Sequence, residues 1–194
     1  MNTFRSAGIA GILSAVLTVV SYLTSDPSSG IPLVWALASA TAGIILVAGL
    51  YLLYRGAAPA LSLTAGAISV IGYLLFVTAS WMQVVFPSPV LVAADVAIYI
   101  LGLSLFSWLA YRTQQMPRGL ALVGFLAALA GAGSYLMLWG TGADVTDMAN
   151  LPPLVMAFFT AYLVGVIAWL AWTGIALLRR AGSQPAAASG SALI

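Results

Sequence analysis

Six apolar stretches dominate this sequence and limit what it can fold into. A hydrocarbon core about 30 Å thick needs about 20 apolar residues of helix to cross it, and a backbone in lipid must satisfy its own hydrogen bonds. Six stretches are long enough: Phe4–Thr24, Pro32–Tyr54, Ala60–Phe86, Val90–Tyr111, Gly119–Trp139 and Pro153–Leu178. The sequence therefore predicts an all-α fold, a polytopic six-helix transmembrane bundle.

The remaining residues are too few for a second domain, because soluble domains generally need at least about 50 residues. Residues 1–180 are therefore expected to form one six-span transmembrane domain. The short basic start also fits a signal peptide, but the first apolar run is about 19 residues long and no A-x-A-like cleavage site follows it. Residues 181–194 are mostly small and have little to bury, so we expect a disordered cytoplasmic tail.

The charged residues sort by side of the membrane. With six spans the two termini share a side, and all six arginines fall on it: Arg5, Arg55, Arg112, Arg118, Arg179 and Arg180. By the positive-inside rule, that side is cytoplasmic. We therefore expect a multi-pass protein of the plasma membrane with both its N and C termini in the cytoplasm. The arginines are scattered rather than clustered, so they predict topology and no nucleic-acid partner.

Most catalytic chemistry is missing from the composition. Glutamate, lysine, histidine and cysteine are all absent. This excludes a serine protease with a histidine base, a retinal Schiff base on lysine, and zinc or haem held by His or Cys. We therefore expect a protein that is not an enzyme and that uses no cofactor or metal.

Asp95 is the only charged residue well inside a predicted span. Ionisable groups inside membranes are costly, which makes them functional candidates. Asp95 lies six residues beyond Pro89, or about 9 Å along a helix, which is in the outer leaflet rather than at the midplane. Two interpretations stay open: a proton or substrate role, and a structural hydrogen-bonding role.

Several polar residues could surround Asp95. Gln83 lies near the outer end of the third span and could pair with Asp95 across the short Pro87-Ser88-Pro89 link, while the Tyr99 hydroxyl lies one turn further along. A polar cavity would be lined by Tyr22, Gln83, Asp95, Tyr99 and Tyr135. A water-accessible cavity would favour transport, whereas a packed interhelical contact would remove the residue-level support for it.

Small residues indicate how the spans pack. The fifth span is rich in glycine and alanine, which let helix backbones approach closely, so we expect it to be surrounded by other helices. The same small-residue rows could also serve a homo-oligomer or a membrane-protein partner. The expected function is non-enzymatic, through protein or lipid partners in the bilayer. The alternative is a small solute or proton-linked transporter or channel that uses Asp95.

Three short segments resemble one group of uncharacterised bacterial six-span membrane proteins, classed as a domain of unknown function. They are Arg5-Ser-Ala-Gly-Ile-Ala-Gly-Ile12, Pro117-Arg118-Gly119-Leu120 and Trp172-Thr-Gly-Ile-Ala-Leu-Leu-Arg179. The resemblance covers about residues 5–180, in the order and hydropathy of the spans. It implies a bacterial membrane protein with six helices, and it carries no catalytic or binding motif.

Overall fold

The computed structural model describes residues 3–24, 32–83, 88–141 and 151–183. Nearly all of them are helical. The helices are α1 (Thr3–Thr24), α2 (Leu33–Tyr54), α3 (Pro59–Trp81), α4 (Pro89–Asp95), the π-helix η1 (Val96–Gly102), α5 (Leu103–Thr113), α6 (Arg118–Thr141) and α7 (Pro153–Ser183). Because α4, η1 and α5 follow one another without a break, these elements make six spans that are long and apolar enough to cross a membrane. The predicted all-α six-helix transmembrane bundle is confirmed.

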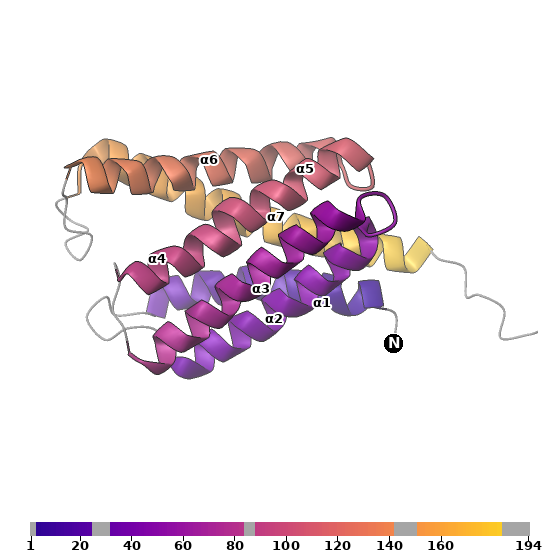
Figure 1. The fold of residues 1–194 in the computed structure, drawn as a ribbon, viewed down its shortest axis with the longest axis horizontal. Coiled ribbons are helices and arrows are strands. Elements are labelled where there is room, and N and C mark those ends of the chain that lie inside the picture. The colour runs from indigo at the N-terminus through magenta and orange to yellow at the C-terminus, as the bar shows by residue number, and fades with distance from the viewer. Residues whose placement is uncertain (1–2, 25–31, 84–87, 142–150, 184–194) are drawn as a thin grey trace, which may run out of the picture.

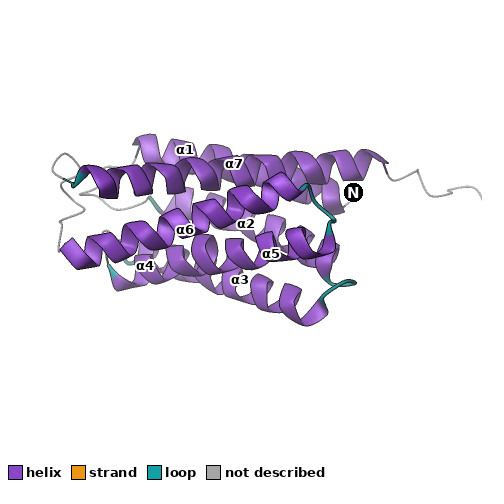
Figure 2. Cartoon of the chain, turned by 90° about the horizontal axis from the view of Figure 1, so that it is seen from above, coloured by secondary structure: helices purple, strands orange, loops and turns teal. Residues whose placement is uncertain are grey.

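The six spans form a closed ring in chain order. Each span contacts the next one along the chain, and the last span, α7, contacts the first, α1. All of them run along the long axis of the molecule (Figures 1 and 2), so α1 begins and α7 ends at the same end of the bundle. The six arginines lie in or beside the helix ends found there, and we call it the arginine end.

Backbone contact between α1 and α7 closes the ring. A Cβ atom added to Gly174 of α7 would lie only 2.6 Å from the carbonyl oxygen of Gly8 and 2.8 Å from the amide nitrogen of Ile12. A Cβ atom on Gly11 would lie 3.0 Å from the Cα atom of Gly174. Glycine at these positions therefore lets the two helices approach closely, which is how helices associate in lipid, where no hydrophobic force drives them together.

The fifth span, α6, is not surrounded by other helices, and that expectation is wrong. Its small residues, such as Gly124 and Ala127, face its neighbours, but its large leucines form an exposed stripe: Leu122, Leu126, Leu129 and Leu136. These leucines recur at helical spacing on one face. A ring of six helices gives each span a lipid-facing side, and α6 fills that side with leucine.

The fourth span departs from a single α-helix. Its middle third is the π-helix η1, which the sequence does not predict. At the other end of the domain, α7 continues through Ser183. Residues 181–183 of the expected tail are therefore helical, and residues 184–194 lie outside the described residues.

We expect Gly174→Ala to lower the free energy of unfolding by about 1–3 kcal/mol, because the added methyl group overpacks the α1–α7 contact. The measurement is thermal unfolding of the purified protein in detergent. Gly182→Ala is the matched control, because Gly182 lies in the same helix with open space around its Cβ position. There alanine only improves helix propensity. Equal stability of the two variants would contradict the close α1–α7 contact.

Candidate polar site around Asp95

Asp95 lies at the end of a short helix whose N-terminus is stabilised by the residues that begin it. Pro89 occupies the first turn of α4, where a missing amide proton costs nothing. The Ser88 hydroxyl accepts a hydrogen bond from the Leu91 amide at 3.3 Å and caps the helix. Asp95 is the last residue of α4, and the chain then continues into η1. The side chain is partly buried among the spans.

Two tyrosines, one from α6 and one from α7, hold the Asp95 carboxyl group. The Tyr162 hydroxyl of α7 donates a hydrogen bond to Asp95 Oδ2 at 2.6 Å. The Tyr135 hydroxyl of α6 donates to the same oxygen at 2.8 Å. Both tyrosines are buried, with 6% and 7% of their surface exposed. We call these three residues the Asp95 cluster. It is a packed contact that joins the last three spans.

Tyr99 belongs to a second, adjoining contact. Its ring packs edge-on against the Tyr162 ring, with centroids 6.4 Å apart and planes at 72°. Its hydroxyl lies near the side chains of Tyr73 of α3 and Thr18 of α1. The hydroxyl groups that donate to Asp95 Oδ2 belong to Tyr135 and Tyr162, so Tyr99 does not have the role expected of it. Instead Tyr99 links the neighbourhood of Asp95 to the first and third spans.

Two glycines bring η1 close to α3. A Cβ atom on Gly72 would lie 2.6 Å from Ile98 Cγ1 and 3.0 Å from the Ala94 carbonyl oxygen. On the other side, a Cβ atom on Gly102 would collide with the Ser69 hydroxyl. A π-helical turn takes an extra residue, so it changes which side chains face the bundle beyond Asp95. Such turns are frequent at functional sites.

Gln83 does not pair with Asp95, and that prediction is wrong. It is an exposed residue in the turn after α3, with a φ of 53° in the left-handed region. Its backbone ends the helix, and its side chain is exposed, whereas the hydrogen bonds of Asp95 Oδ2 come from Tyr135 and Tyr162. The side chain of Tyr22 lies outside the described part of the structure.

A small cavity of about 20 Å³ lies beside the tyrosines, with Tyr73, Tyr99, Ser69 and Trp169 among its lining residues. It has room for about one water molecule. Asp95 does not line it. Within the described ranges, no three side chains of His, Cys, Asp or Glu gather as metal ligands. The arrangement can hold a carboxyl group in a fixed position through two hydroxyl donors.

Sequence reasoning included Tyr135 among the residues near Asp95 but missed Tyr162, Tyr73 and Thr18. One feature of the sequence could have indicated that a tyrosine binds Asp95. A buried tyrosine needs a partner for its hydroxyl, and a tyrosine well inside an apolar span has few available. Asp95 offers acceptor oxygens in the same leaflet, so a tyrosine such as Tyr162 was a natural candidate for the donor.

We expect Tyr162→Phe to lower the free energy of unfolding by about 1–2 kcal/mol, because it removes one donor from a carboxyl group inside the bundle. In an Asp95→Leu background the same change should cost much less, because no acceptor is left. Thermal unfolding of the four proteins in this double-mutant cycle gives the coupling.

Tyr111→Phe is the control for loss of a tyrosine hydroxyl, since Tyr111 is 50% exposed. We expect it to leave stability unchanged within about 0.5 kcal/mol. If Tyr162→Phe costs the same with and without Asp95, the two residues are not coupled and the Asp95 cluster does not stabilise the bundle.

Comparison with known proteins gives no family assignment. No family model, no curated protein and no solved structure matches this chain. The resemblance to uncharacterised bacterial six-span proteins therefore stays an expectation from the sequence.

Proposed function

We propose that this protein is a non-enzymatic integral membrane protein of the bacterial plasma membrane that acts through lipid or protein partners. The observation that carries the proposal is the Asp95 cluster. The carboxyl group most suited to chemistry inside the membrane is held by two buried tyrosine hydroxyls. Its role is to position α4, α6 and α7 relative to one another.

Composition and surface support the same proposal. The chain has no histidine, cysteine, lysine or glutamate, so it lacks the usual nucleophiles, bases and metal ligands. Large apolar side chains such as Leu126 and Val164 are exposed, at 66% and 60%. An outward-facing surface of this kind contacts lipid tails or other membrane helices, including a second copy of the chain.

A small proton-linked transporter or channel is the second candidate, and specific observations favour it. The π-helix begins immediately after Asp95. On α7, Trp169 and Thr173 follow Tyr162 at intervals of seven and four residues, which places all three on one face. Within the described residues, Trp169 Nε1 and Thr173 Oγ1 are buried without a hydrogen-bond partner. Water molecules bonded to these atoms could extend from the tyrosines toward the arginine end.

Proton flux separates the two candidates. We expect liposomes that contain the protein and an internal pH dye to show no proton flux beyond that of liposomes carrying Asp95→Asn. The physical reason is that a packed carboxyl group without a connected water path does not exchange protons with both sides. Proton flux that is present in the wild-type protein and disappears in a folded Asp95→Asn protein would favour the transporter. It would overturn the structural role proposed for Asp95.

We also propose that the arginine end is cytoplasmic, following the positive-inside rule. The natural absence of cysteine makes this testable with single substitutions. We expect an impermeant maleimide to label Gly140→Cys in intact cells and to label Gly56→Cys only after permeabilisation. Both glycines are exposed with open space around the Cβ position, and they lie at opposite ends of the bundle. The reverse labelling pattern would show that the arginine end lies outside the cell and would contradict the proposed topology.

A further inference from the structure

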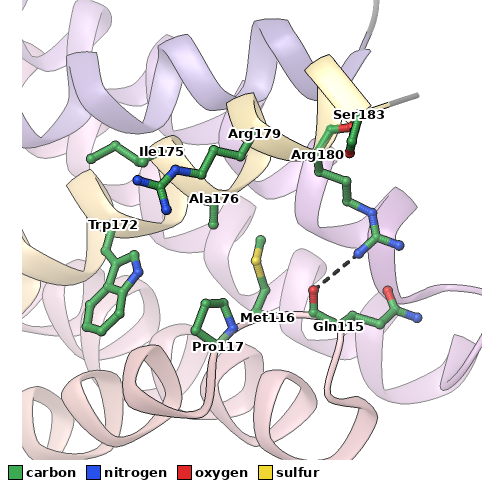
Figure 3. Close-up of a pocket in the computed structure, with 9 residues that line it drawn as sticks. All are labelled: Gln115, Met116, Pro117, Trp172, Ile175, Ala176, Arg179, Arg180 and Ser183. Carbon is green, nitrogen blue, oxygen red and sulfur yellow. Dashed lines mark hydrogen bonds between the residues drawn. The ribbon is translucent and has the colours of Figure 1, made fainter. Parts of the chain in front are cut away.

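A cavity of about 710 Å³ opens at the arginine end, between the α5–α6 turn and the last turns of α7 (Figure 3). The turn contributes Gln115, Met116 and Pro117. The helix contributes the rest: Trp172, Ile175, Ala176, Arg179, Arg180 and Ser183. This cavity is far from the Asp95 cluster, because α4 begins at the opposite end of the bundle (Figure 1).

The cavity carries positive charge that the described protein does not neutralise. Arg180 donates one hydrogen bond to the backbone carbonyl oxygen of Gln115, at 3.2 Å. In the described part of the chain, Arg179 has no hydrogen-bond or ion-pair partner. Asp95 is the only carboxylate side chain in the described ranges, and it lies at the other end. The two guanidinium groups therefore have donors left for an anion, and guanidinium geometry suits phosphate.

One wall of the cavity is apolar and lies toward the membrane interior. Trp172 and Ile175 are partly exposed on α7, about two turns and about one and a half turns before Arg180. A Cβ atom on Gly119 would lie 2.9 Å from Trp172 Cη2, so a glycine at the start of α6 leaves room for the indole ring. The indole ring of Trp172 therefore lies against the start of α6 and forms one wall of the cavity.

Helix length gives the depth of each part. The 31 residues of α7 span about 46 Å, which exceeds a hydrocarbon core of about 30 Å. Counting about 20 residues from Pro153 places the hydrocarbon boundary near Trp172, and Arg179 then lies about 10 Å further, at the level of the lipid headgroups. The cavity therefore runs from headgroup depth to the edge of the hydrocarbon.

We propose that this cavity binds an anionic phospholipid, with Arg179 and Arg180 at its phosphate and with Trp172 and Ile175 against its glycerol and first acyl carbons. The order of charged and apolar walls matches the orientation of a lipid in the membrane. A soluble anion would use the arginines alone and leave the apolar wall empty. Basic cavities between helices at a membrane surface are known to bind anionic headgroups. The inference rests on the proposed function and names the lipid partner.

The test is native mass spectrometry of the detergent-solubilised full chain, titrated with phosphatidylglycerol or phosphatidylcholine of the same acyl chains. We expect tighter binding of phosphatidylglycerol. Arg179→Gln and Arg180→Gln should each weaken it about fivefold, as expected for one basic residue near an anionic lipid. Arg55→Gln is the matched control. It removes the same charge from the same end of the bundle, outside the cavity, and should leave the affinity unchanged.

Three outcomes would overturn the proposal. The wild-type protein could show no preference for phosphatidylglycerol, or Arg55→Gln could weaken binding as much as the cavity variants, which would mean diffuse attraction. Inorganic phosphate could displace the lipid at equal concentration, which would mean a site for a soluble anion. If lipid binding fails, the proposed function can still stand, with a protein as the partner. The proposed function itself is tested by the separate proton-flux assay, so the two failures are distinguishable.

Discussion

The hydrogen bonds between Asp95 and two tyrosines are the interaction on which the arrangement of the later spans depends. Helices in lipid gain little from burying apolar surface, so close backbone contact and polar contacts must hold them together. Asp95 provides a polar contact to Tyr135 and Tyr162, and the Tyr99 ring packs against the Tyr162 ring. Together with the glycine contact between α1 and α7, these bonds close a ring of six spans.

The number and order of spans could be predicted because apolar length alone determines them. Val90–Tyr111 was predicted for the fourth span, and Pro89–Thr113 is observed. The π-helix could not be predicted, because Val96–Gly102 is apolar apart from Tyr99 and gives no signal of an extra residue per turn. Asp95 stood out as a lone charge, but its partners lie 40 and 67 residues away. Contacts between residues so far apart in the sequence depend on how the spans pack together, and the hydropathy of each span does not predict that packing.

The two ends of the bundle carry different polar groups. Under the two proposals, Asp95 at one end serves the packing of helices, and Arg179 and Arg180 at the other end bind a lipid headgroup. The cavity there forms because the closed ring brings the α5–α6 turn against the last turns of α7. A protein that lacks most reactive side chains can still distinguish lipids by charge and shape, and that is the kind of activity this composition permits.

The most direct test of the central claim is infrared spectroscopy of the Asp95 carboxyl band, identified by its loss in Asp95→Asn. A packed carboxyl group bonded to two buried tyrosines should give a band that stays constant across the pH range in which the protein is folded and that exchanges slowly with deuterated solvent. A band that titrates and exchanges rapidly would show a water-accessible group and would contradict the structural role assigned to Asp95.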